Sequence, residues 1–354
     1  MMKENELMEF RPESQLVAER TPIARAAFPV IDAHTHLCGR FRTEKFWMRY
    51  DIDNVVADLR GRGIAHIVAL ELYTRKHWDY IGGMIAPYGD FISRCAPISP
   101  GLYGDDFEQA LLSDMTYYYE NGAKGFKVWK TLGLSVRNAD GILLRLTDKK
   151  LSSVWRTAGE MALPVVIHVG DPPAFFQPAD LRNERYTELA KRPDWSYTGT
   201  DCPSYEELQG QFEQLLCEHP GTIFIAAHMA GAAHNLDYVE TMLDTCANLY
   251  VDTAAVLSEL GRQPRRFKRL AEKHANRILF GTDFFAGDAL PHEPCFRFMQ
   301  TEDEYFPYDA GGEFTQGMWN IYGCKLAEEM LQKIYYENAA GIFKLPRGRC
   351  AHEA

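Results

Sequence analysis

The stretch PVIDAHTH, residues 29–36, is a short apolar run that ends in two histidines one residue apart. It is the first of eight β-rich runs, each followed by turn residues or by a segment with helical spacing, which is typical of β-α units around a parallel sheet. The other seven runs are AHIVALEL (65–72), FISRCAPI (91–98), AKGFKVWK (123–130), LPVVIHVG (163–170), TIFIAAHM (222–229), LYVDTAAV (249–256) and RILFGTDF (277–284). Eight such units in 354 residues favour a single closed (β/α)8 barrel of the TIM type, an α/β fold, over two smaller sheets.

The segments between these runs predict the outer helices and two insertions. Helical spacing predicts helices within 54–63, 106–122, 149–162, 205–221 and 236–248. Two long connections, 171–204 and 285–323, are rich in Pro, Gly and aromatic residues, and connections of this length are typical of lids or binding loops. We therefore expect an N-terminal arm over residues 1–29, followed by a barrel domain over 30–354 that carries both insertions.

The composition is that of a globular protein. With 46% hydrophobic residues and a net charge of -11, it offers little attraction for nucleic acid or for an anionic membrane surface. The first 20 residues are charged throughout, and no window is apolar enough for a membrane span, so a cytoplasmic location is expected. The eight cysteines contain no Cys-x-x-Cys pair and predict neither a disulfide framework nor a zinc knuckle. We expect a small-molecule substrate, and a homodimer is only the base-rate expectation.

Polar side chains end several of the apolar runs. In a parallel barrel the chemistry takes place at the C-terminal ends of the strands, so these positions are the candidates for function. They are His34, His36, Lys127, His168, His228 and Asp283.

The histidines and Asp283 have the chemistry of a metal site. Side chains alternate along a strand, so His34 and His36 are expected to point to the same side and to reach one ion. Together with His168 and Asp283 they would suit Zn²⁺ and leave a position open for water, as in catalytic sites. Each residue alone has another interpretation: a histidine bonded to a backbone carbonyl, a capping Asp283, or a Lys127 that extends to solvent. The set as a whole favours a metal site over coincidence.

Six motifs carry a resemblance to a known family. They are DAHTH (32–36), GFKVWK (125–130), VVIHVGD (165–171), IAAHMAG (225–231), LFGTDF (279–284) and IYYENAAGIFKL (334–345). The combination resembles the amidohydrolase superfamily, specifically its amidohydrolase-2 branch, over about residues 30–345. That branch includes metal-dependent decarboxylases of aminocarboxymuconate semialdehyde and of resorcylate, lactonases and related hydrolases. Its members are (β/α)8 barrels, in agreement with the count of strands.

The resemblance implies roles for individual residues. In the decarboxylase-like members, the corresponding positions imply that His34, His36, His168 and Asp283 hold one divalent metal ion. His228 would contact the metal-bound water and act with Asp283 as the catalytic pair. The branch often has His-x-Gly-Gly on strand six, whereas this chain has HMAG, so the match there is partial. Zinc is the expected metal, with manganese as the alternative, because His and Asp ligands tolerate both.

Lys127 leaves the number of ions open. In binuclear members of the superfamily, a strand-four lysine in a setting similar to GFKVWKT becomes carboxylated and bridges two metals. If Lys127 were carboxylated, His168 and His228 would hold the second ion. The alternative, which agrees better with the mononuclear branch, is that the Lys127 ammonium pairs with a substrate carboxylate or with a neighbouring acid.

Three functions remain as alternatives. The first is hydrolysis of a lactone, amide or ester of a small carboxylic acid or sugar derivative by metal-activated water. The second is decarboxylation of an aromatic or dienoic acid, for which Lys127 with Arg182 and Arg185 would supply a cationic pocket. Either substrate would suit aromatic walls, and the insertions offer several aromatic candidates. Those selected for the pocket are Trp195, Tyr305 and Trp319. The third is a metal-containing binding protein without turnover.

Overall fold

The computed structural model describes residues 14–38, 51–71, 74–286, 291–309 and 315–345. Each of the eight predicted runs contains a strand, and the eighth run contains β8 and the start of β9. The strands are β1 Val30–His36, β2 Ile64–Leu70, β3 Ile92–Ile98, β4 Gly125–Val128, β5 Val165–Ile167, β6 Phe224–Ala226, β7 Leu249–Asp252, β8 Ile278–Leu279 and β9 Phe284–Phe285. All pairings are parallel, in the order β8-β7-β6-β5-β4-β3-β2-β1-β9.

The segment from β8 to β9 closes the sheet into a barrel. β8 pairs with β7, whereas β9 pairs with β1. Between them, Ala33 donates its N–H to the carbonyl of Phe280 at 2.9 Å, and Asp283 donates its N–H to the carbonyl of His34 at 2.8 Å. One short stretch of chain therefore bonds to both edges of the sheet, and the predicted (β/α)8 barrel is confirmed.

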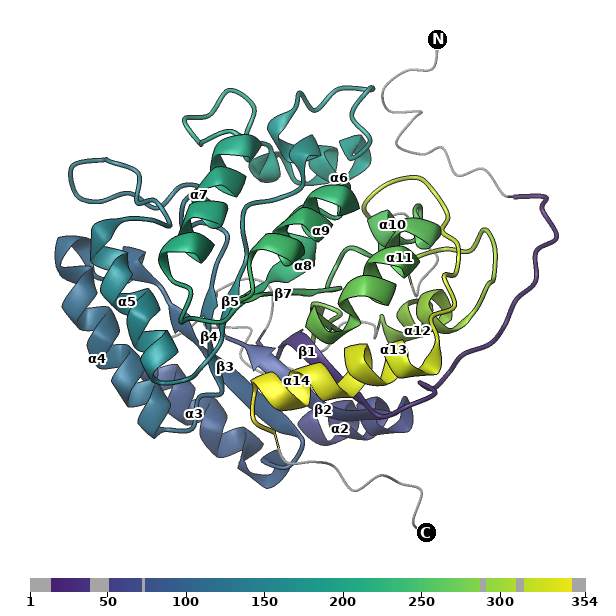
Figure 1. Ribbon diagram of the computed structural model, residues 1–354, viewed down its shortest axis with the longest axis horizontal. Coiled ribbons are helices and arrows are strands. Elements are labelled where there is room, and N and C mark those ends of the chain that lie inside the picture. The colour runs from purple at the N-terminus through teal and green to yellow at the C-terminus, as the bar shows by residue number, and fades with distance from the viewer. Residues whose placement is uncertain (1–13, 39–50, 72–73, 287–290, 310–314, 346–354) are drawn as a thin grey trace.

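Helices surround the strands, as the helical spacing predicts (Figure 1). The longer ones are α2 Ile52–Gly61, α3 Arg75–Ile85, α4 Phe107–Glu120, α5 Lys149–Glu160, α7 Tyr205–Glu218, α9 Leu236–Thr245, α11 Pro264–His274 and α12 His292–Gln300. The shorter ones are α6 Tyr186–Lys191, α8 Ala227–Ala230, α10 Leu257–Leu260, α13 Glu328–Gln332 and α14 Asn338–Ile342. Local sequence sets their ends: Ser204 and Glu207 form a capping box at the start of α7. None of the described helices is both long and apolar enough to cross a membrane.

The core has two layers. The larger cluster lies between the strands and the helices and includes Phe126 and Val128 of β4. A smaller cluster gathers alternate strand residues such as Val166 with residues of the C-terminal segment around α14, which contacts β1 and β8. Because neighbouring residues of a strand point to opposite faces, Lys127 points into the barrel, between two outward-facing neighbours.

Both insertions contact the segment that follows β7. The first insertion contains α6, and its Arg185 forms an ion pair with Glu259 of α10. The second contains α12, and its Trp319 donates its indole N–H to the carbonyl of Ser258 at 3.0 Å. The predicted arm contacts the second insertion, where Thr21 donates its backbone N–H to Asp303 at 2.7 Å. Residues 1–13, 287–290, 310–314 and 346–354 of the expected arm, insertion and barrel lie outside the described residues, and the domain boundaries stay predictions.

Candidate metal centre

His34, His36 and Asp283 meet where the barrel closes. The Oδ1 atom of Asp283 lies 3.4 Å from Nε2 of His34 and 3.1 Å from Nε2 of His36. Both histidines are buried, whereas the side chain of Asp283 is 25% exposed. Within the described residues, one ligand atom from each of the three lies within 4.8 Å of the other two. The structure therefore brings together the strand-one pair and the strand-eight carboxylate, as the sequence predicts.

The local backbone explains this convergence. Asp283 has a φ of +60°, a conformation that L-residues rarely adopt, and it occupies the break between β8 and β9. Two residues earlier, a Cβ on Gly281 would lie 2.9 Å from Cβ of His34, so glycine permits the close approach of the two segments. Uncommon backbone conformations of this kind concentrate at functional sites, because the surrounding structure must stabilise them.

The charge states of these groups suit a cation. Burial, followed by the charge of Lys127, holds the pKa of His34 well below its ordinary value. Burial alone would raise the pKa of Asp283, but its contact with His36 and the nearby histidine charges lower it overall. His34 is therefore neutral and Asp283 ionised at neutral pH, which are the forms in which imidazole and carboxylate bind metal ions.

His228 lies next to His34, and His168 lies next to His228. The ring of His228 lies 4.9 Å from that of His34 and 4.3 Å from that of His168, measured between centroids. Burial, followed by the charge of His228, holds the pKa of His168 well below its ordinary value. His168 does not belong to the close group that His34, His36 and Asp283 form, and its Nδ1 atom is buried without a hydrogen bond.

His228 has a fixed orientation. It lies just after β6 with a φ of +58°, and Met229 and Ala230 also have positive φ values. Its Nδ1 atom lies 2.8 Å from the carbonyl oxygen of Ala254, which can only accept a hydrogen bond. Nδ1 therefore carries a proton, and in the neutral form of the ring Nε2 has its lone pair available for a ligand or a reacting group.

Asp252 is a buried part of the site that the sequence analysis did not select. It is the last residue of β7, and its Oδ2 atom lies 2.7 Å from Nδ1 of His34. Its Oδ1 atom accepts the backbone N–H groups of His228 and Ala254 at 2.8 and 3.1 Å. Burial raises the pKa of Asp252, and the charge of His228 opposes that effect. The rule applied to the other strands, a polar residue at the strand end, would have identified it.

Two lysines flank the histidines. Lys127 is completely buried, and its Nζ atom lies 3.4 Å from Nε2 of His34. Burial lowers its pKa to about 8, although Asp283 and Asp252 act in the opposite direction. Lys130 donates to Oδ2 of Asp171 at 2.5 Å.

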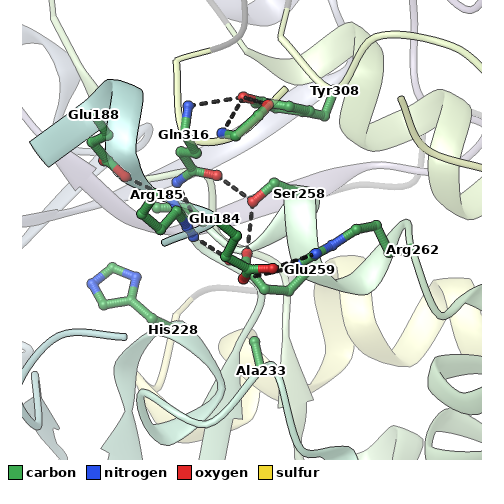
Figure 2. A network of polar contacts seen from close by, with 12 residues as sticks. Glu184, Arg185, Glu188, His228, Ala233, Ser258, Glu259, Arg262, Tyr308 and Gln316 are labelled. Atoms are coloured by element: carbon green, nitrogen blue, oxygen red, sulfur yellow. Dashed lines mark hydrogen bonds and ion pairs between the residues drawn. The ribbon is translucent and has the colours of Figure 1, made fainter. Parts of the chain in front are cut away.

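The two arginines predicted for a cationic pocket have other partners. Arg182 bonds to Asp180, and its side chain is 89% exposed. Arg185 is 2% exposed and forms ion pairs with Glu188 at 2.8 Å and with Glu259 (Figure 2). Burial raises the pKa of Glu188 to about 7, despite the opposing charge of Arg185. These contacts give no support to a substrate-binding role for Arg182, and they occupy the guanidinium of Arg185 with protein carboxylates.

The aromatic candidates for the pocket lie in different surroundings. The ring centroid of Trp195 lies 5.2 Å from Nζ of Lys130, the lysine that is bonded to Asp171. Trp319 is half-buried and donates its indole N–H to Ser258, while Tyr305 is 39% exposed. Of the three, Trp195 lies beside Lys130, which bonds to Asp171.

The donor set fits a divalent cation. The Nε2 atom of His36 and the Nδ1 atom of His168 are buried and make no hydrogen bond, which is costly unless another group satisfies them. When the proton of His34 is on Nδ1, the lone pair of its Nε2 atom faces the carboxylate of Asp283 at 3.4 Å with no proton between them. Two nitrogen donors and a carboxylate in this arrangement are typical of zinc ligands, and a cation between them would satisfy all three.

Comparisons with known proteins agree with the barrel fold. The fold is similar to 2,6-dihydroxybenzoate decarboxylase from Rhizobium, at a TM-score of 0.58 and 15% identity over 90% of this chain and 99% of that one. It is also similar to an uncharacterized TIM-barrel protein from Bordetella bronchiseptica, at a TM-score of 0.57 and 13% identity over 90% of this chain and 99% of that one. An amidohydrolase from Burkholderia multivorans with bound zinc has a TM-score of 0.52 and 10% identity over 90% of this chain and 100% of that one.

At these identities the likeness shows the fold alone. A search of curated protein sequences gave no match. The family model described as amidohydrolase matches residues 31–345, nearly the whole barrel, and confirms the resemblance inferred from the motifs. The chain therefore belongs to the amidohydrolase-2 family.

Proposed function

We propose that the protein is a divalent-metal-dependent hydrolase that cleaves a lactone, amide or ester of a small carboxylic acid or sugar derivative. His34, His36, His168 and Asp283 would hold one ion, with zinc as the preferred metal. The observation that carries the proposal is the convergence of two histidine nitrogens and one carboxylate within 4.8 Å at the point where the barrel closes. The buried Nδ1 atom of His168, which makes no hydrogen bond, and the Nε2 atom of His36, which faces the Asp283 carboxylate at 3.1 Å, support it.

The residues divide the chemistry between them. A bound divalent ion would lower the pKa of a water molecule from about 15.7 toward about 7 and polarise a substrate carbonyl. Asp283 is ionised and partly exposed, so its carboxylate can take a proton from the attacking water and pass it to the leaving group. His228 presents a fixed imidazole whose free Nε2 atom can orient the water or the substrate.

A second candidate is non-oxidative decarboxylation of an aromatic or dienoic acid. The observation that favours it is the buried Nζ atom of Lys127, 3.4 Å from His34. With a pKa of about 8, Lys127 is mostly an ammonium group at neutral pH and could pair with a substrate carboxylate. The same lowered pKa provides a fraction of neutral amine, which is the form that carboxylation of Lys127 would require.

Metal analysis tests the site itself. Protein purified without chelators is expected to contain about one divalent ion per chain. Replacing His36 by Gln should lower that content, whereas replacing His66 by Gln should not, because His66 bonds to Ser93 away from the candidate site. A wild-type protein that neither contains nor takes up a divalent ion would contradict the proposal. A content near two ions would favour the version with a carboxylated Lys127.

A substrate panel tests the reaction. Lactones, esters, amides and carboxylated aromatic or dienoic acids would be incubated with the metal-loaded protein, and both acid release and carbon dioxide release would be measured. Acid release that stops after chelation and returns with zinc is the result expected for the hydrolase. Metal-dependent release of carbon dioxide without net hydrolysis would overturn it in favour of the second candidate.

A further inference from the structure

Asp252 connects two parts of the candidate metal centre. The residue is 1% exposed, and the three contacts of its carboxylate reach β1, the segment after β6 and its own strand end. One oxygen faces Nδ1 of His34 at 2.7 Å, and the other accepts the backbone N–H groups of His228 and Ala254. A single carboxylate thus contacts a predicted metal ligand and the backbone of the predicted catalytic histidine.

We propose that Asp252 is a positioning residue that holds His34 in the tautomer with the proton on Nδ1. The inference rests on the proposed metal site, and it adds a residue to which neither the sequence analysis nor the comparisons give a role. When Oδ2 of Asp252 accepts this hydrogen bond, Nδ1 of His34 is the donor and Nε2 of the neutral imidazole keeps its lone pair. Nε2 is the atom that faces Asp283, and a lone pair is what a metal ion requires there.

An independent contact points to the same tautomer. The Nζ atom of Lys127 lies 3.4 Å from Nε2 of His34. An ammonium group has only donors, so it is compatible with an unprotonated Nε2 and incompatible with an N–H at that position. Asp252 on one side of the imidazole and the ammonium form of Lys127 on the other therefore favour the same proton position.

The second oxygen of Asp252 holds the backbone that carries His228. Positive φ values at His228 and Met229 are uncommon for residues with a side chain, and the hydrogen bond from His228 N–H to Asp252 stabilises this turn. The carbonyl of Ala254, whose own N–H is bonded to Asp252, accepts Nδ1–H of His228. Residues 252–254 therefore set the ring orientation of both histidines.

The substitution Asp252→Asn separates the electrostatic role from the shape. The amide oxygen of Asn can still accept the two backbone N–H groups, but its NH₂ group then faces Nδ1 of His34. Two donors cannot face each other, so His34 is expected to move its proton to Nε2, where it blocks metal binding. Loss of an orienting partner of this kind lowers metal affinity about 10- to 100-fold.

The experiment reads the tautomer of His34 directly in metal-free protein by NMR of histidine ring nitrogens, with the resonance assigned through His34→Gln. We expect Nδ1–H in the wild type, Nε2–H in Asp252→Asn, and an about 10- to 100-fold weaker zinc affinity in that variant. The control is Asp303→Asn, another buried Asp, which accepts hydrogen bonds from Thr21 and Arg297 outside the site. It should leave the His34 resonance and the zinc affinity unchanged.

The outcomes distinguish this inference from the proposed function. A wild-type His34 with its proton on Nε2, or an Asp252→Asn protein with wild-type tautomer and zinc affinity, overturns the positioning role. If Asp252→Asn does not fold, the wild-type spectrum alone decides. A wild type that shows the Nδ1–H tautomer but binds no metal would refute the proposed function and leave the positioning of His34 intact.

Discussion

Replacement of Lys127 by methionine is expected to stabilise the metal-free protein at neutral pH. Burial lowers the pKa of Lys127 from 10.5 to about 8, and one pKa unit corresponds to about 1.4 kcal/mol. Keeping the buried group charged below pH 8 therefore costs the folded state about 3 kcal/mol relative to the unfolded chain. Methionine has a similar length and no charge, so the Lys127→Met protein should gain up to that amount.

The stability difference between Lys127→Met and the wild type should depend on pH, because the charge of Lys127 does. Between about pH 8 and about pH 10.5 the unfolded chain still binds the proton of Lys127 and the folded protein does not, so wild-type stability rises with pH in this window. The advantage of Lys127→Met should be largest below pH 8 and should disappear above about pH 10.5. Urea denaturation of both proteins at several pH values, with a chelator and in buffer free of carbon dioxide, measures the difference.

Lys130 provides a matched control for Lys127. Lys130 is two residues beyond the end of β4, but its Nζ atom is paired with Asp171 at 2.5 Å. Lys130→Met leaves a buried carboxylate without its cation and should lower the free energy of unfolding by about 2 kcal/mol. The reasoning is refuted if Lys127→Met is no more stable than the wild type near pH 7, or if its advantage does not decrease as the pH rises.

Three further substitutions test the site and the insertions. Asp283→Asn removes a ligand charge and the proton acceptor, so both zinc content and kcat/KM should fall, the latter by about 10³-fold; unchanged activity at full metal loading would contradict its role. His228→Gln should keep the metal but lower kcat by about 10²- to 10⁴-fold, and a loss of metal with normal kcat per bound ion would instead make it a ligand. Arg185→Met leaves the carboxylate of Glu259 buried without its partner and should cost about 3–5 kcal/mol in urea denaturation. The exposed Arg182→Met serves as its control and should unfold near the wild-type midpoint, so equal effects of the two arginines would argue against the buried ion pair.

Much of the architecture could be predicted because its signals are local. Apolar runs of strand length, separated by helical spacing, predict the barrel, and the residues that end those runs must lie at one face of it. This is why the sequence alone predicts that His34 and Asp283, 249 positions apart, lie together. Their roles as ligands stay predictions until the metal is measured.

Other features have no local signal. The eighth run contains β8 and the start of β9 rather than one strand, because Asp283 adopts a positive φ and bonds to the opposite edge of the sheet. The sequence predicts that Arg185 could bind a substrate carboxylate, but in the structure Glu259, 74 residues away, is paired with its guanidinium.

The family, the barrel and the residue types at its C-terminal face follow from the sequence, because periodicity and strand-end position are properties of short stretches of chain. Which of those polar groups face one another depends on the closed barrel. Three properties depend on partners that are distant in the sequence, such as Asp252, 218 residues from His34. They are the charge of the buried Lys127, the availability of Arg185, and the position of the proton on His34. Desolvation and hydrogen bonding act over a few ångströms in space, so these states exist only once the barrel has closed.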